Sequence, residues 1–398
     1  MDYLTNDTDL KKVADAIRAK GGTSAPLAYP SGFVSAIQAI KSAPATPYME
    51  AEYVAVEDGS ITSHYIKSAK LYNHTAVYAY EFATQYNLNS LDFGDASNNI
   101  TTIEADAFTS ANLAGIVLPD TITSLQDACF AQAFIATLEL PAQITEIPKN
   151  AFRGINAAYS SETDEELPIN IILPPNLTKI GNYCFYNAQI KQISIPDTVT
   201  EIGESAFQYC IGLTSFVIPP LLQKIPQYML QGCENITAIT IPAAVTEIGE
   251  GAFENTGITS ITIPATITTL GMSMLRSCVN LATINIQTNV TEIPDRFAQE
   301  SGRTSVTLPD TVETIGDSAF SSSRANLTEI TIPASVTSIG DYAFAQNESM
   351  TTITCLAATP PTLGRNAFTM NTINTTIKVP AASVAAYKAA ADWSTWAD

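Results

Sequence analysis

The chain has 398 residues, and its 19 Lys and Arg against 39 Asp and Glu give a net charge of −20. This charge repels phosphate backbones and anionic bilayers, so it argues against nucleic acid as a partner. No apolar run approaches the roughly 18–20 residues that span a bilayer, so we expect a soluble protein without membrane insertion. The first residues, MDYLTNDTDLKK, are acidic and polar. If they are the native start, we expect no export by the general secretory route.

Residues 1–41 are expected to form a helical docking segment. Leu10, Val13 and Ile17 share one face of a short helix that Gly21–Gly22 ends, and a second short helix follows Pro30. Helices this short are marginal alone, so they must pack on each other, on another subunit of a possible homo-oligomer, or on something larger. The residues expected to dock are Leu10, Val13, Ile17, Phe33, Ile37 and Ile40.

The stretch DTDLKKVADAIRAKGGTSAPLAYPSGFVSAIQAI (7–40) resembles a leader found on many predicted tail proteins of phages and prophages in gut Bacillota. The resemblance implies docking on virion tail or baseplate proteins. The residues themselves leave a second interpretation open, in which the helices are a folded cap without a docking role.

Residues 42–92 begin with a linker-like SAPATP and contain both histidines, His64 and His74. We interpret this region as a cap that shields the first coil of a repeat domain. The alternative is an aromatic platform for a ligand, because tyrosine offers a stacking face and a polar tip. The region holds Tyr48, Tyr53, Tyr65, Tyr72, Tyr78, Tyr80 and Tyr86.

Residues 93–376 repeat one unit, which reads SIPDTVTEIGESAF at 194–207 and TIPAAVTEIGEGAF at 240–253. Each unit has a strand-like I-x-I-P, and the steps between these prolines are mostly 22 or 23 residues. The step from Pro141 to Pro174 is longer and contains the acidic stretch SSETDEELP. The aligned prolines are Pro119, Pro141, Pro174, Pro196, Pro219, Pro242, Pro264, Pro309 and Pro333, and Gln287 replaces one of them.

One unit contains two strand-like segments. In ITSITIP (258–264), Ile261 and Ile263 would point inward while the hydroxyl residues between them face out. In VTEI (245–248) the first and last residues point inward, and Gly249 stops the segment. A single coil cannot bury its own apolar edge, but stacked coils can. The sequence therefore predicts a β-rich solenoid of about twelve coils joined by parallel ladders.

A large apolar residue follows each proline at about the eleventh position, which predicts a buried column along the solenoid axis. The column residues are Phe130, Phe152, Phe185, Phe207, Leu230, Phe253, Leu275, Phe297, Phe320 and Phe344, with Phe108 and Phe368 in less regular copies.

The pattern resembles the BspA-type leucine-rich repeat family over about residues 90–380. Its marks are I-x-I-P, V-T-x-I-G, A-F and the Cys of FQYCIGL (207–213). The segments CLAATPPTLGRNAF (355–368) and 377–398 look like the closing coil, strand and capping helix of that family. One departure is NIQTNVTEIPDRF (285–297), which lacks the corner proline and is one residue short, so we expect a bend or a loosened coil there.

We find no pattern typical of a metal site, a cofactor site or a catalytic site. The cysteines form no C-x-x-C pair and are expected to be buried free thiols. The alternative is a disulfide between Cys210 and Cys233, which lie in successive coils. Catalytic serine, zinc-protease and nucleotide-binding motifs do not occur, so we do not expect an enzyme. The cysteines are Cys129, Cys184, Cys210, Cys233, Cys278 and Cys355.

The outward side of the I-x-I-P strands is the candidate binding face. Its short hydroxyl side chains lose little entropy on binding, which suits hydrogen bonds to a sugar or a protein. The alternative is that Thr is simply a favoured exposed strand residue. The candidate residues are Ser194, Ser215, Thr240, Ser260, Thr262, Thr283, Asn285, Ser305, Thr307, Glu329 and Thr331.

Two functions agree with these patterns. The first is a phage tail-associated adhesin in the virion, with residues 1–41 on the tail and the solenoid on a bacterial cell-surface glycan or protein. The second is a BspA-like adhesin, at the bacterial surface or secreted, that binds proteins of a host or a neighbouring cell.

Overall fold

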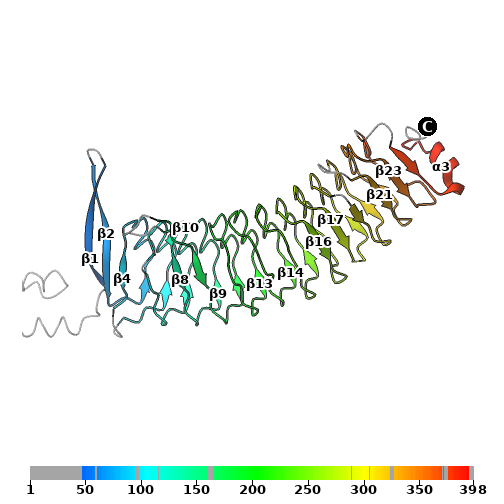
Figure 1. The fold of residues 1–398 in the computed structure, drawn as a ribbon. Helices are drawn as coiled ribbons and strands as arrows, with labels where there is room; N and C mark the ends of the chain where they lie inside the picture. The colour runs from blue at the N-terminus through cyan, green and yellow to red at the C-terminus, as the bar shows by residue number, and fades with distance from the viewer. Residues whose placement is uncertain are drawn as a thin grey trace, which may run out of the picture.

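The chain winds into a parallel β-solenoid of about 13 turns (Figure 1). The computed structural model describes residues 47–58, 61–94, 98–114, 116–158, 165–287, 289–303, 305–322, 327–369, 371 and 375–393. The predicted solenoid is confirmed, and the helices expected within residues 1–41 lie outside the described residues.

One long side of the solenoid carries the strands that precede the corner prolines, and we call it the proline flank. Apolar residues alternate with exposed polar ones along these strands, as in β16, where Ile261 and Ile263 are buried and Thr262 is exposed. Its strands are β4 (Ser90–Asp92), β8 (Thr137–Glu139), β11 (Asn170–Ile172), β16 (Ser260–Ile263), β17 (Thr283–Ile286), β19 (Ser305–Thr307), β21 (Glu329–Ile332), β23 (Thr352–Cys355) and β25 (Thr376–Lys378).

A second side, the glycine flank, carries the strands of the V-T-x-I-G segments. Each is two residues long and pairs in parallel with a neighbouring coil, so that Ile180 lies beside Ile147 and Ile202. Its strands are β3 (Ala76–Val77), β5 (Thr102–Ile103), β6 (Ser124–Leu125), β9 (Glu146–Ile147), β12 (Lys179–Ile180), β13 (Glu201–Ile202), β14 (Lys224–Ile225), β15 (Glu247–Ile248), β18 (Glu292–Ile293), β20 (Thr314–Ile315), β22 (Ser338–Ile339) and β24 (Thr362–Leu363). A further parallel pair joins β7 (Phe134–Ile135) to β10 (Asn156–Ala157).

A column of phenylalanine rings runs between the flanks. The rings of Phe152, Phe185 and Phe207 stack with centroids 5.1 Å apart and interplanar angles of 7–9°. The column begins earlier than the aligned copies suggested, because Phe82 stacks on Phe108 at 5.4 Å. All of these rings are fully buried, so each coil supplies the surface that covers its neighbour.

The expected place of Phe297 in the column is wrong by one residue. In regular coils, the N–H of the column residue donates to a carbonyl of the next coil. That carbonyl belongs to the residue just before the next column residue, as when Phe207 donates to the Met229 carbonyl at 3.0 Å. Leu275 donates in this way to Phe297, and Ala298 donates to Ala319, so Ala298 occupies the ring position. The Phe297 ring consequently meets Phe320 edge-on, at 6.0 Å and 75°.

The fully buried Arg303 lies beside this small alanine. Its guanidinium carbon lies 5.2 Å from the Phe320 ring centroid, and its N–H groups donate to the carbonyls of Ala298 and Phe320 and to Ser301 Oγ. Burial lowers the pKa of Arg303, and these oxygen acceptors offset the loss of water around the charge. Figure 1 shows the solenoid axis turning gradually from about β16 onward, over a stretch that includes the short coil of residues 285–297.

Both ends of the column are covered. At the N-terminal end, β1 (Tyr48–Asp58) and β2 (Ile61–Tyr72) form an antiparallel hairpin that rises past the body in Figure 1, and β2 pairs with β4. At the other end, η1 (Ala381–Ser383) and α3 (Val384–Ala389) follow β25.

The C-terminal segment covers the last coil through two aromatic side chains. Tyr387 donates its hydroxyl to the Ala357 carbonyl at 2.8 Å, and Trp393 donates Nε1–H to the Pro361 carbonyl at 2.8 Å. The Trp393 ring lies 5.7 Å from Phe368, so it closes the ring column against water.

We expect Phe207→Ala to lower the unfolding free energy by about 3–5 kcal/mol, because it removes two ring contacts and leaves a cavity. The readout is urea denaturation followed by circular dichroism. The control is Tyr209→Ala in the same coil, where the side chain is 40% exposed and the loss should stay below about 1 kcal/mol. Equal losses in the two variants would contradict the buried ring column.

Candidate functional site

The predicted hydroxyl array lies exposed on the proline flank, as expected from the alternation. Parallel pairing places Thr283 between Ser260 and Ser305, and Asn285 between Thr262 and Thr307. The structure therefore brings these two rows together on one sheet. The remaining predicted residues are less regular: Glu329 and Thr331 belong to the separate sheet β21–β23–β25, and Ser194, Ser215 and Thr240 lie outside assigned strands.

The sequence analysis missed the exposed apolar residues of the same flank. Val117, Ile172 and Val217 stand at the outward position of I-V-L-P, I-I-L-P and F-V-I-P, and they are 81%, 40% and 75% exposed. The signal was visible, because each apolar residue stands where other coils carry Ser or Thr. Exposed apolar side chains within an otherwise hydroxyl-rich surface are candidates for contact with a partner.

A groove of about 380 Å³ opens around two of these apolar residues. Val117 and Ile172 contribute to its lining together with Asp120 and Glu139. Glu139 at the end of β8 pairs directly with Ile172 of β11, so a carboxylate stands beside an exposed aliphatic side chain.

The glycine flank carries an exposed ladder of alternating charge. Lys179 lies 3.0 Å from Glu201, and Lys224 lies 3.2 Å from Glu247 on the next pair of coils. The hydrogen bond that Lys179 donates to Glu201 raises the pKa of Lys179. Pairs this exposed contribute about 0–1 kcal/mol each, so the ladder stabilises the coil register only slightly and is not a catalytic arrangement.

Three cysteines, Cys210, Cys233 and Cys278, share one geometry in the core of their coils. Cys210 donates its thiol to the Phe185 carbonyl at 3.0 Å, and Cys233 donates to the Phe207 carbonyl at 3.1 Å. All six cysteines are buried and free, as expected, and burial raises the pKa of the Cys184 thiol well above its usual range. In the part of the chain that the structure describes, no group of three metal-ligating side chains comes together.

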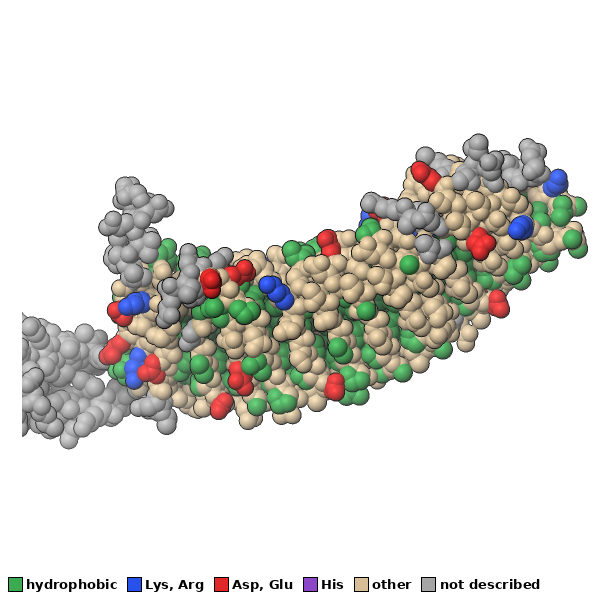
Figure 2. Space-filling model, viewed as in Figure 1, with side chains coloured by type: hydrophobic (Ala, Val, Ile, Leu, Met, Phe, Trp, Pro, Cys, Tyr) green, Lys and Arg blue, Asp and Glu red, His purple; other side chains and the backbone are tan. Residues whose placement is uncertain are grey.

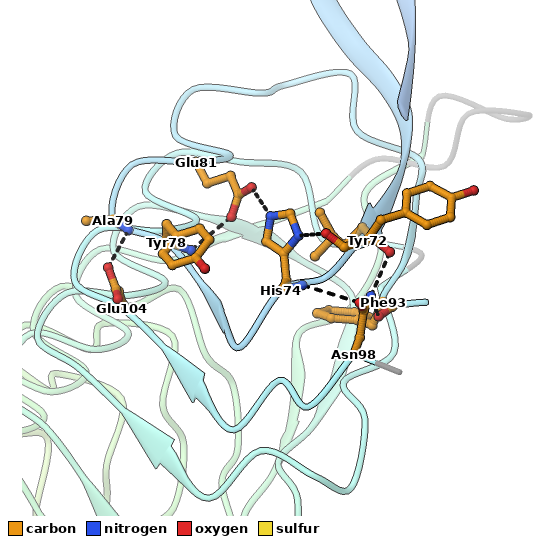
Figure 3. A network of polar contacts seen from close by, with 9 residues as sticks. Tyr72, His74, Tyr78, Ala79, Glu81, Phe93, Asn98 and Glu104 are labelled. Atoms are coloured by element: carbon orange, nitrogen blue, oxygen red, sulfur yellow. Dashed lines mark hydrogen bonds and ion pairs between the residues drawn. The ribbon is translucent and has the colours of Figure 1, made fainter. Parts of the chain in front are cut away.

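A buried polar network ties the N-terminal hairpin to the first coil (Figure 3). His74 is 2% exposed, and its Nδ1 lies 2.9 Å from the Tyr72 carbonyl while Nε2 lies 2.9 Å from Glu81 Oε1. Both ring nitrogens thus lie within hydrogen-bond distance of an oxygen. Asn98 donates to the carbonyls of Leu71 and Phe93 and accepts from the His74 N–H. These groups bond to one another rather than to solvent, which agrees with the interpretation of a cap.

Some tyrosines of this region pack against other aromatic rings, and others are exposed to solvent. Tyr48 and Tyr72 stack with centroids 4.8 Å apart, and Tyr65 meets Tyr86 edge-on at 6.0 Å. Tyr80 is 67% exposed. The side chain of His64 lies outside the described residues.

We expect His74→Leu to destabilise the first coils by about 3 kcal/mol, because it leaves the Glu81 carboxylate without its buried partner. Hydrogen exchange followed by mass spectrometry should show faster exchange in β3 and β5 and unchanged exchange beyond β16, since coils contact only their neighbours. The control Lys67→Ala removes the exposed ion pair with Glu52 and should leave exchange unaltered. Protection retained in His74→Leu would show that the network does not hold the cap.

A family model described as a BspA type leucine rich repeat region of six copies matches the chain. The matched residues are 75–210, 165–281, 200–326 and 273–390. The chain belongs to the BspA-type leucine-rich repeat family. BspA-like proteins are generally at the cell surface or secreted, and repeat solenoids of this kind are typically binding proteins. Within the described residues, no helix has both the length and the apolar character that crossing a membrane requires.

Solved structures with similar folds come from several bacteria. A leucine-rich repeat protein from Bacteroides ovatus is 22% identical, with coverage of 83% of this chain and 94% of that one and a TM-score of 0.48. A leucine rich cell surface protein from Faecalibacterium prausnitzii is 19% identical, with coverage of 90% and 99% and a TM-score of 0.39. The pneumococcal vaccine antigen PcpA is 15% identical, with coverage of 84% and 89% and a TM-score of 0.45.

No curated protein matches the chain. The BspA-type match begins at residue 75, so it leaves residues 7–40 untouched. The phage-tail resemblance of that segment therefore stays a prediction.

Proposed function

We propose that this BspA-type protein is a non-enzymatic surface adhesin whose proline flank binds proteins of a host or a neighbouring cell. The observation that carries the proposal is the continuous exposed row of outward side chains on a stiff parallel ladder, from Ser260 and Thr262 to Ser305 and Thr307. The parallel ladder fixes the backbone from which these side chains project before any partner arrives, which lowers the entropy lost on binding.

The surface chemistry also favours a protein or a glycan over a strongly charged polymer. On the face shown in Figure 2, acidic and basic side chains are few and scattered among neutral ones. Hydroxyl and amide groups such as Thr262 and Asn285 both donate and accept hydrogen bonds, and an extended flank can contact a partner over several coils.

The test is a charge substitution on the binding face. Replacing Thr240, Thr262 and Thr307 together with Lys should lower the binding of the purified protein to cells about tenfold or more, because long charged side chains displace the partner from the flank. Flow cytometry with fluorescent protein measures the binding.

The matched control places the same three charges on the glycine flank, at the exposed residues Thr246, Thr268 and Thr337. Binding should then stay within about twofold of the wild type. An equal loss in both variants would mean that net charge, not the proline flank, controls adhesion.

The phage-tail alternative predicts a different role for residues 1–41. Under that alternative, a protein that lacks residues 1–41 keeps its solenoid but is no longer incorporated into virions. Under the adhesin proposal, the truncated protein still binds cells through the flank. Particles that still carried the truncated protein would exclude the docking role of Leu10, Val13 and Ile17.

A further inference from the structure

The proline flank changes character between the coils of Pro119 and Pro174. Its outward positions there are Val117, Glu139 and Ile172, whereas the later coils expose Thr262, Asn285 and their neighbours at that position. Parallel pairing puts Glu139 beside Ile172, and Val117 holds the same position one coil earlier. A carboxylate thus stands between two exposed aliphatic side chains.

The surroundings of this carboxylate are hollowed and rigid. The groove of about 380 Å³ is lined mainly by aliphatic residues, and Pro141, Pro174 and Pro175 form part of its wall. Prolines have a fixed backbone angle, so this wall keeps its shape without a ligand. The groove lies at the longer repeat step from Pro141 to Pro174, the one place where the coil length departs most from the rest.

The groove carries two carboxylates. Among the described residues, its lining contains Asp120 and Glu139 but neither Lys nor Arg. Neither carboxylate forms an ion pair with the described residues, whereas Glu201 and Glu247 of the glycine flank each have a lysine within 3.2 Å. A cationic group would complement the two carboxylates, and the net charge of −20 would favour its approach.

The aliphatic walls narrow the choice of cation. An arginine side chain has an apolar stem that can cover Val117 and Ile172 while its guanidinium reaches a carboxylate in two-pronged geometry. A free metal ion would leave the aliphatic walls exposed to water, and a neutral sugar would leave both charges unpaired.

We propose that the Glu139 groove binds an arginine-bearing basic segment of a partner protein, an inference that rests on the proposed adhesin function and names its partner chemistry. The arginine pairs with Glu139 and Asp120. Apolar residues of the same segment pack on Val117 and Ile172.

Fluorescence anisotropy of the full chain tests this directly with two labelled peptides, one of alternating Leu and Arg and one of alternating Leu and Gln, at physiological salt. The Arg peptide should bind about tenfold more tightly than the Gln peptide. Glu139→Gln should weaken binding of the Arg peptide about fivefold or more, and Ile172→Thr about threefold. Both side chains are exposed, so melting curves should not change.

Two variants away from the proline flank serve as controls. Glu313→Gln makes the same charge change on the glycine flank, and Val279→Thr makes the same kind of apolar change at an exposed position. Both should bind the Arg peptide like the wild type. An equal loss in Glu139→Gln and Glu313→Gln would show attraction by net charge alone and would overturn the groove proposal.

Equal binding of the two peptides, or no binding of either, would also overturn the inference. The adhesin proposal is judged separately by cell binding. If Glu139→Gln binds cells normally while the threonine-to-lysine variant does not, the adhesin function stands and the groove proposal fails. If the wild type binds no cells, the adhesin function itself fails.

Discussion

Coil-on-coil burial is the constraint on which the whole molecule depends. Each coil has an apolar edge and a row of backbone groups that only the next coil can cover or bond. The stack of Phe152, Phe185 and Phe207 and the N–H donated from Phe207 to Met229 show both parts of this dependence at one place. Stability is therefore shared between neighbours along the chain and is not concentrated in a globular centre.

The same constraint explains the irregular places. Where the column loses its ring at Ala298, Phe297 enters from the side and the Arg303 guanidinium bonds the carbonyls there. The two ends have no further coil to cover them, so the β1–β2 hairpin and the Trp393 ring do so. The buried His74–Glu81 pair belongs to this capping arrangement and not to a reactive centre.

Because inward positions are committed to packing, outward positions are where coils can differ without loss of the fold. The proline flank uses this freedom in two ways, with hydroxyl rows over β16, β17 and β19 and an aliphatic groove with carboxylates around Glu139. This solenoid thus separates the buried residues that build it from the exposed residues that we propose to recognise a partner. That separation suits an adhesin, because binding residues can change coil by coil.

The sequence by itself determined the solenoid, the two flanks and the inward positions, since the alternation in ITSITIP and the return of Phe every 22 or 23 residues reflect local geometry and stacking. It also showed the candidate threonines to be exposed. Only the tertiary structure decided the shift from Phe297 to Ala298, the burial of Arg303 and the groove between Val117 and Ile172. These features arise from contacts between coils, and the pairing of side chains across coils depends on registers that a linear pattern does not contain.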